Sequence, residues 1–302
     1  MLINTTGSGK TRLLLEGLCH RWGFYFVAKR DTTGIGSRDF ERFMGGLDHA
    51  EGYAEATKRK MKKKAGLDRK AVEHIRRVAR GRLAQLLLAR FLLLDLLIQE
   101  AGKLEGGLQH KEHRRLWVLL QVQPRILVSR FAVDVFTDLT QLLRGVEFDN
   151  LQSRIDKKRE ELRPFLPAVH NPATGEDTPP PFFCVLDEVQ ATIAPQSGRL
   201  GEFMSDNNKT PRPILREIWL VWSDIPDMRL VLAGTGIEAQ TLNETLASNA
   251  CKDQGYDIVH DFGAFDCRET QNKYIMRYLP AAWNEPQWKM FLDRAWYWLR
   301  GR

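Results

Sequence analysis

Apolar runs alternate with segments of helical apolar spacing along most of the chain. Runs with little polar alternation lie at residues 23–28, 182–186 and 228–233, and such runs are typical of strands covered on both faces of a parallel sheet. Further strands are expected at residues 256–262 and in the three residues at the N-terminus. Because helical segments separate these runs, the pattern predicts an α/β protein with a mainly parallel sheet of about five strands and flanking helices.

A long helical insertion separates the second of these strands from the next. Helical apolar spacing extends over residues 69–102 and 111–162, and we expect an all-helical subdomain that packs on one edge of the sheet. Its most apolar stretch, Leu86 to Ile98, contains Arg90 and Asp95 and is shorter than the roughly 20 residues that a membrane-spanning helix needs. We therefore expect a buried helix there and no membrane segment.

The residues before the first helix have the composition of a phosphate-binding loop (Walker A). Residues 4–11 read Asn-Thr-Thr-Gly-Ser-Gly-Lys-Thr, which matches G-x-x-x-x-G-K-[ST] except that Asn4 replaces the first glycine. Asparagine adopts left-handed backbone angles more readily than most residues, so the match is weakened without being lost. Backbone N–H groups of such a loop, and the dipole of the following helix, bind phosphates. We expect ATP to contact Thr6, Gly7, Ser8, Gly9, Lys10, Thr11 and Arg12.

The expected site has a second half at the end of the apolar run 182–187 (Walker B). Lys10 would reach the β- and γ-phosphates, while the Thr11 hydroxyl and the Asp187 carboxylate would bind Mg²⁺. Glu188 is the candidate base that activates the attacking water. Because the carboxyl ends of parallel strands share one edge of a sheet, we expect the loop and Asp187 to converge there from neighbouring strands.

The run at 228–233 also ends in small and hydroxyl residues, Gly234-Thr235-Gly236. Thr235 is therefore a candidate sensor that hydrogen-bonds the attacking water or the γ-phosphate. The alternative is that these residues only turn the chain from strand to helix. The sequence leaves both interpretations open.

These motifs together resemble the P-loop NTPase module of fungal Crinkler-type proteins, which resemble in turn the retrotransposon-hot-spot proteins of protists. The resemblance implies an ATPase fold related to AAA+ and signal-transduction ATPases, with Lys10, Thr11, Asp187 and Glu188 in the roles given above. It does not extend to the nuclease modules that some family members carry. The resemblance is carried by residues 6–18, 22–26, 36–39 and 186–190, and more loosely by 262–265.

The motifs divide the chain into four parts. Two parts of an NTPase core are expected at residues 1–40 and 166–265, separated by a basic and helical insertion at 41–165. Residues 266–302 are expected to begin the helical lid that AAA-like ATPases place over the nucleotide. Both ends look cut, because at most three residues precede the loop and the last helical segment ends without a breaker. Arg268 is a weak candidate for the arginine that such a lid supplies.

Positive charge is concentrated in one segment. The formal net charge is +7, and residues 58–82 hold twelve Lys or Arg against two acidic residues, so this segment alone carries an excess of ten. The run from Lys58 to Lys64 resembles a nuclear import signal and would also suit the phosphates of a nucleic acid. A solvated linker is the alternative. Aromatic residues that could stack on bases are missing from the run, which argues against a dedicated single-strand platform.

Two classes of function remain open. The first is an ATPase in which nucleotide drives a conformational switch. The second is a binding module that keeps the fold but hydrolyses little, and engages nucleic acid or an acidic protein through Lys58 to Arg82. A helicase is a minor variant, because Asp-Glu-Val-Gln at 187–190 resembles a D-E-x-Q box but a second motor domain is not visible. The four cysteines form no C-x-x-C pair, which favours reduced thiols inside the cell, in the nucleus or the cytoplasm.

Overall fold

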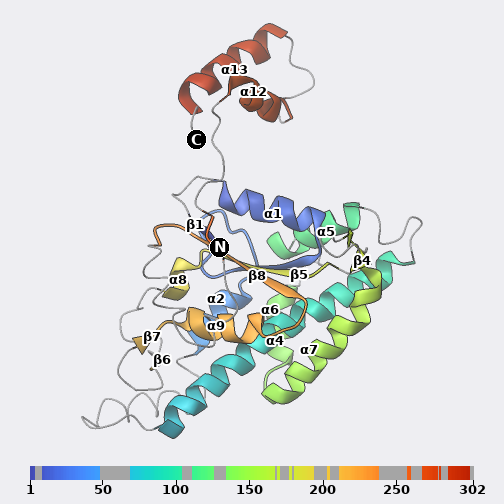
Figure 1. Cartoon of the computed structure of the whole chain (residues 1–302), viewed down its shortest axis with the longest axis vertical. Coiled ribbons are helices and arrows are strands. Elements are labelled where there is room, and N and C mark those ends of the chain that lie inside the picture. Colours follow the sequence, from blue (N-terminus) through green and yellow to red (C-terminus); the bar gives the residue numbers. More distant parts are fainter. Residues whose placement is uncertain are drawn as a thin grey trace.

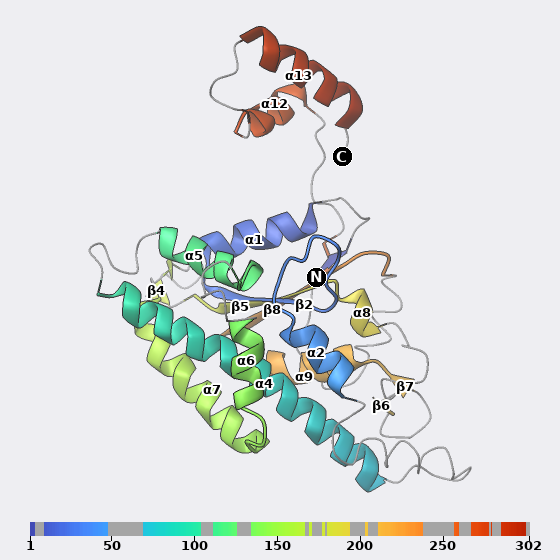
Figure 2. The same cartoon turned by 180° about the vertical axis from the view of Figure 1, so that it is seen from behind.

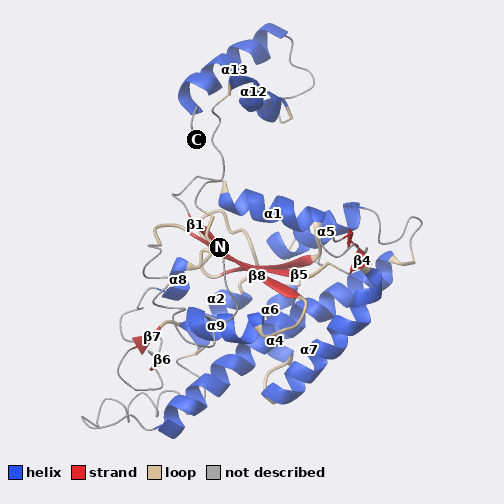
Figure 3. Cartoon of the chain, in the orientation of Figure 1, coloured by secondary structure: helices blue, strands red, loops and turns tan. Residues whose placement is uncertain are grey.

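Four parallel strands form the centre of the molecule (Figure 1, Figure 3). Their order in the sheet is β1 (Leu2–Ile3), β8 (Met228–Gly234), β5 (Phe182–Asp187) and β2 (Gly23–Val27). The prediction of a parallel α/β architecture is confirmed. This computed structural model describes residues 1–3, 9–47, 69–103, 111–125, 134–166, 169–170, 177–178, 180–193, 203–204, 211–237, 257–259, 267–277, 279 and 285–299.

The sheet of the described residues has four strands, where the sequence predicted about five. Within the described residues 257–259 of the fifth expected strand, Val259 forms a single parallel bridge with Leu2. The Ile3 amide donates to the Val259 carbonyl at 3.0 Å, and the Val259 amide donates to the Met1 carbonyl at 2.7 Å. Because β1 has only two residues, it offers a partner too little length for a longer ladder. Val259 therefore lies beside β1, on the side away from β8.

The strands β2 and β5, at one side of the sheet, are buried on both faces. All five residues of β2 are buried, and β5 is buried except at Phe183. The register places Phe24 opposite Cys184 and Val27 opposite Asp187. Double-sided burial explains why these strands appear in the sequence as runs without alternation.

Helices cover both faces of the sheet, and the two views of the chain agree on their arrangement (Figure 1, Figure 2). One face carries α1 (Lys10–His20) and α5 (Lys111–Val122). The other carries α2 (Asp39–Gly46), α4 (Arg69–Ala101), α6 (Val135–Leu142), α7 (Phe148–Leu162) and α9 (Ile214–Ser223). The insertion thus contributes helices to both faces. The expectation that it packs on one edge of the sheet is wrong.

The insertion also shares its core with the sheet. The Phe24 ring of β2 lies 4.7 Å from the Phe91 ring of α4 and 5.8 Å from the Phe182 ring of β5, measured between ring centroids. The predicted buried helix at 86–98 is confirmed within α4, where Leu87 and Phe91 are fully buried. Since one continuous cluster of buried side chains includes α4 and the strands, the insertion is part of the core rather than a separate subdomain.

Short elements complete the described chain. They are a 3₁₀ turn η2 (Arg163–Phe165), the pair β3 (Val169–His170) and β4 (Asp177–Thr178), α8 (Gln190–Ile193), and the pair β6 (Phe203–Met204) and β7 (Pro211–Arg212). Near the C-terminus, α12 (Arg268–Met276) and α13 (Glu285–Leu299) pack against each other. Among the described helices, none is long and apolar enough to cross a membrane.

Candidate functional site

Helix α1 begins at one edge of the sheet with the last residues of the predicted phosphate loop. Gly9 has a φ of +80°, the left-handed conformation that favours glycine, and α1 starts at the next residue, Lys10. The expected contacts of Thr6, Gly7 and Ser8 lie outside the described residues.

The structure brings Thr11 and Asp187 together across 176 positions of sequence. The Thr11 hydroxyl donates a hydrogen bond of 2.6 Å to Asp187 Oδ2. Asp187 is the last residue of β5 and is buried, so its carboxylate is held at the carboxyl edge of the sheet. The two oxygens expected to bind Mg²⁺ are therefore adjacent.

The strands that carry this pair are not neighbours. We expected Asp187 to lie on the strand next to that of the loop, but β8 lies between β1 and β5. The hydrogen bond still forms because all of these strands are parallel and end at the same edge. The residues at the end of β8 consequently lie between the two halves of the site.

Tyr25 also contacts Asp187, and it was not among the residues predicted for the site. Its hydroxyl, on the neighbouring strand β2, donates to Asp187 Oδ2 at 3.1 Å. Burial raises the pKa of the Tyr25 phenol far above its usual value, and the charge of Asp187 raises it further. Tyr25 therefore stays protonated and remains a donor. The feature of the sequence that could have marked Tyr25 is its hydroxyl group within an otherwise apolar strand.

Glu188 adopts a backbone conformation that is rare for its residue type. Its φ is +56°, in the left-handed region that costs a residue with a Cβ roughly 1–2 kcal/mol. Its amide donates to Asp187 Oδ1 at 2.9 Å. Strained positions of this kind gather at functional sites, and this one follows directly after the carboxylate that meets Thr11.

Gln190 connects the candidate base with the candidate sensor. The Gln190 amide nitrogen donates to the Glu188 carboxylate and, at 3.1 Å, to the Thr235 hydroxyl. The Thr235 backbone amide donates back to Gln190 Oε1 at 3.2 Å. Thr235 thus lies within the same hydrogen-bond network as Glu188. The feature of the sequence that marks Gln190 is its place as the fourth residue of the D-E-x-Q pattern at 187–190.

Lys10 completes the polar cluster at this edge. Its side chain is buried, and burial lowers the pKa of its ammonium group, while the charges of Asp187 and Glu188 raise that pKa in part. A desolvated cation near two carboxylates is stabilised further when an anion enters the site. This environment suits a lysine that contacts phosphates.

The two arginines named from the sequence have other partners. Arg12 donates to Glu16 through Nε at 2.8 Å and Nη2 at 2.7 Å, and its guanidinium lies 4.3 Å from the centre of the Tyr274 ring. Arg268 forms an ion pair with Asp293, which joins α12 to α13. Arg12 thereby connects the helix after the phosphate loop with α12.

The described part of the chain offers oxygen ligands for a divalent cation but no dedicated metal cluster. No group of three or more His, Cys, Asp or Glu residues in that part is arranged to hold a metal ion. Mg²⁺ at nucleotide sites binds one or two protein oxygens and takes its other ligands from phosphates and water. The Thr11 hydroxyl and Asp187 carboxylate fit that requirement.

The basic segment is only partly described. Lys58 to Lys64 lies outside the described residues. In the continuation along α4, Arg76 and Arg80 form ion pairs of 3.7 and 2.9 Å with Glu217, which is fully buried in α9. Part of the excess positive charge therefore forms ion pairs within the molecule, between α4 and α9.

Comparison with known proteins adds nothing to this geometry. No family model, no curated protein and no solved structure matches the chain. The contacts among Thr11, Asp187, Glu188 and their neighbours alone mark this edge as a candidate site.

Proposed function

We propose that the chain binds ATP with Mg²⁺ and hydrolyses it, as the resemblance to Crinkler-type P-loop NTPases would imply. The hydrogen bond between Thr11 and Asp187 carries this proposal, because it unites the two halves of the predicted site. A chance glycine-rich turn at the N-terminus would have no reason to meet an acidic strand end 176 positions away. The buried Lys10 and the strained Glu188 at the same edge support the same conclusion.

Each residue has a distinct role in the proposed reaction. Lys10 neutralises the β- and γ-phosphates, and Thr11 and Asp187 hold the Mg²⁺, which balances charge on the phosphates. Glu188 accepts a proton from water as the water oxygen bonds to the γ-phosphorus and the bond to the β–γ bridging oxygen breaks. ADP and phosphate are the products. Thr235 hydrogen-bonds the γ-phosphate or the water.

The proposed hydrolysis would drive a conformational switch through α1. Its first turn carries Lys10 and Thr11, and the guanidinium of Arg12 on the same turn contacts Tyr274 of α12. A change in phosphate occupancy at the start of α1 would therefore reach the α12–α13 pair. This is the part of the chain expected to begin a lid.

Lys10→Ala and Glu188→Gln separate binding from hydrolysis. Lys10→Ala is expected to weaken ATP binding, measured by calorimetry with Mg²⁺, by about tenfold or more, because a charge-assisted contact is lost. Glu188→Gln is expected to leave ATP affinity within about twofold and to lower turnover by about 10²-fold or more, since general-base catalysis contributes this much. Matched controls are Lys157→Ala and Glu147→Gln, both on exposed residues of α7 or its cap. Wild-type turnover in Glu188→Gln would show that Glu188 is not the base.

A second candidate is a nucleotide-binding module with little hydrolysis. The observation in its favour is the Gln190 amide, which already occupies the Glu188 carboxylate. For such a module, ATP binding would depend on Lys10 while phosphate release stayed at background in the wild type and in Glu188→Gln. Its partners would be nucleic acid or an acidic protein in the nucleus or the cytoplasm, engaged through Lys58 to Arg82.

A further inference from the structure

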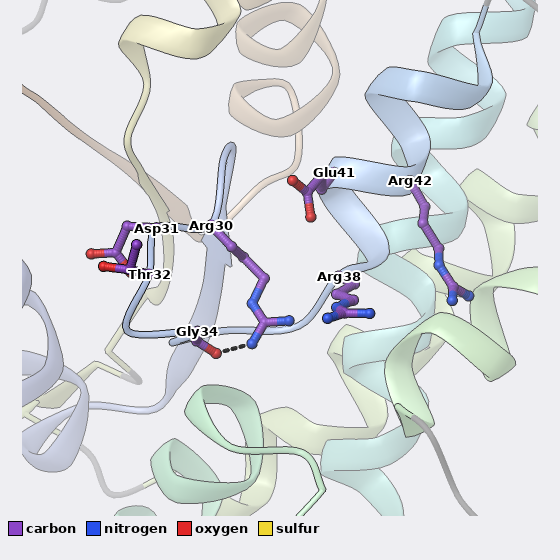
Figure 4. A pocket seen from close by; sticks show the side chains of 7 residues that line it. All are labelled: Arg30, Asp31, Thr32, Gly34, Arg38, Glu41 and Arg42. Atoms are coloured by element: carbon purple, nitrogen blue, oxygen red, sulfur yellow. Dashed lines mark hydrogen bonds between the residues drawn. The ribbon is translucent and has the colours of Figure 1, made fainter.

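A polar pocket lies beyond the carboxyl end of β2 (Figure 4). Its cavity has a volume of about 610 Å³ and follows the end of β2. Val27 pairs with Asp187 in the sheet, and the Ala28 amide donates to the Asp187 carbonyl at 2.9 Å. The pocket is therefore one strand away from the candidate nucleotide site. It is lined by Arg30, Asp31, Thr32, Gly34, Arg38, Glu41 and Arg42.

The loop that forms this pocket has a fixed shape. Gly36 has a φ of +93°, and a Cβ at that position would lie 2.5 Å from Val27 Cγ1. The Gly36 amide also donates to the Val122 carbonyl at the end of α5 at 2.8 Å. Only glycine fits there, so the loop is held against β2 and α5, and the arginines around it are presented from a defined backbone.

Positive charge in the pocket is not matched by ion pairs. Figure 4 shows the guanidinium groups of Arg30 and Arg38 near each other, while Asp31 points to the other side of the loop. The Asp31 carboxylate accepts hydrogen bonds from the amide and hydroxyl of Thr33 in its own turn. Among the described residues, neither Glu41 nor Asp31 forms an ion pair with an arginine of the pocket.

Arg30 shows the imbalance most clearly. It donates one hydrogen bond from Nη2 to the Gly34 carbonyl, while its buried Nε has no hydrogen-bond partner. Burial lowers the pKa of Arg30, the charges of Arg38 and Arg125 lower it further, and those of Glu41 and Asp134 oppose this effect. Asp134 is also engaged elsewhere, because its carboxylate caps α6 and accepts from the Ser37 hydroxyl.

We propose that this pocket binds a phosphate group of a nucleotide or of a nucleic-acid strand, at a site separate from the Thr11–Asp187 pair. Guanidinium groups present several N–H donors in a plane, and the oxygens of a phosphate accept them in pairs. A phosphate also supplies the negative charge that the clustered arginines lack. The cavity volume is within the range of small-molecule sites, so it can admit the sugar or base that follows the phosphate.

The test measures binding of two probes, AMP and a short oligothymidylate, to the Arg38→Gln/Arg42→Gln double variant. Both arginines are exposed, so the fold should be retained, which a thermal melt would check. Arg154→Gln, an exposed arginine on α7, is the matched control. All proteins carry Lys10→Ala, which removes the lysine of the first site from the measurement. This test is therefore independent of whether the chain hydrolyses ATP.

We expect the double variant to bind the phosphate probe about tenfold more weakly, because charge-assisted hydrogen bonds are lost. If the double variant binds both probes more weakly, the phosphate of a free nucleotide is sufficient for binding. If it binds only the oligothymidylate more weakly, the pocket binds a nucleic-acid strand. In the second case the slope of log affinity against log salt should fall by about 1.4, or roughly 0.7 for each arginine. Unchanged affinity, an equal loss in Arg154→Gln, or no binding of either probe by the protein with an intact pocket would overturn the proposal.

Discussion

The carboxylate of Asp187 is oriented by donors from three places in the chain. Thr11 at the start of α1 and Tyr25 on β2 donate to Oδ2, and the amide of Glu188 donates to Oδ1. If Asp187 holds Mg²⁺ as proposed, the loss of a donor that orients its carboxylate should lower the affinity for the ion. At the scale of single residues, the candidate site is thus defined as much by Tyr25 and Gln190 as by the residues of the sequence motifs.

Tyr25→Phe removes one of these donors without changing the size of the core. The Mg²⁺ concentration needed for half-maximal ATP binding should rise several-fold, because Asp187 loses an orienting hydrogen bond. The free energy of unfolding should fall by only about 1 kcal/mol. Thr140→Val is a control for the loss of a hydroxyl, since Thr140 donates to the Phe136 carbonyl at 2.7 Å within α6. An equal Mg²⁺ requirement in Tyr25→Phe and wild type would exclude a role for Tyr25 in positioning Asp187.

Gln190→Ala tests the bridge between Glu188 and Thr235. We expect turnover to fall about tenfold with ATP affinity nearly unchanged, because the base and the sensor lose the amide that orients both. Gln99→Ala is the control, as the Gln99 side chain makes a comparable hydrogen bond of 3.0 Å to Asp95 at an exposed position of α4. If turnover rose instead, Gln190 would be a restraint on Glu188, as the hydrolysis-poor candidate requires.

At the scale of elements, a buried ion pair joins α2, α4 and β2. Arg90 of α4 donates to the Asp39 carboxylate of α2 at 2.5 and 3.2 Å, and neither side chain is exposed by more than 1%. The Arg90 guanidinium also lies 4.4 Å from the centre of the Phe26 ring and 3.8 Å from that of Phe136. Either charge of this buried pair would destabilise the fold if its partner were removed.

Arg90→Met should destabilise the protein by about 3–5 kcal/mol, because Asp39 is left buried and unpaired. The double variant Arg90→Met/Asp39→Leu should be more stable than the sum of the single variants would give, since both charges are removed together. Urea unfolding of the two single variants and the double variant measures this difference. If the losses of unfolding free energy in the two single variants add up to the loss in the double variant, Arg90 and Asp39 are not energetically coupled.

The elements differ in how far the sequence predicted them. The strands β2 and β5 were predictable because burial on both faces leaves an apolar run, and β8 was predictable because its apolar residues continue to the buried end of the strand. The position of α5 was not, because polar groups fix it: Trp117 Nε1 donates to the Gly23 carbonyl at 2.7 Å, and Gln121 accepts from the Tyr25 amide at 2.8 Å. These bonds cover the edge of β2, and apolar periodicity contains no information about them.

The residues of the candidate site also differ in how far the sequence predicted them. Thr11 and Asp187 could be selected because the phosphate loop and the acidic strand end have fixed chemistry and spacing. The role of Tyr25 could not be predicted, because it depends on which strands lie side by side, and the D-E-x-Q pattern marked Gln190 without showing that it bridges Glu188 and Thr235. The position of β8 between β1 and β5 could not be predicted either, because packing of the whole sheet sets the order of its strands.

At the scale of the whole molecule, the insertion and the strands form one core. Leu87 of α4 is fully buried within the same cluster as Phe24 of β2 and Leu232 of β8. Side chains from segments far apart in the sequence fill this space together. Weakening α4 should therefore weaken the sheet that carries the candidate site.

Leu87→Ala should lower the free energy of unfolding by about 2–5 kcal/mol. Hydrogen exchange should report the loss in β2 and β5 as well as in α4, because these elements open together. Leu96→Ala on the same helix is the control, since Leu96 is 54% exposed. Exchange that accelerates in α4 while β2 stays protected would show that the insertion unfolds as an independent unit.

The left-handed backbone of Glu188 has a consequence for the evolution of the chain. Glycine at this position would relieve the conformational strain and would remove the candidate base in the same step. Stability and chemistry therefore favour different residues at position 188. Glutamate at this position would persist in relatives only where selection favours it over the more stable glycine, so the residue they carry there would test whether the proposed hydrolysis is under selection.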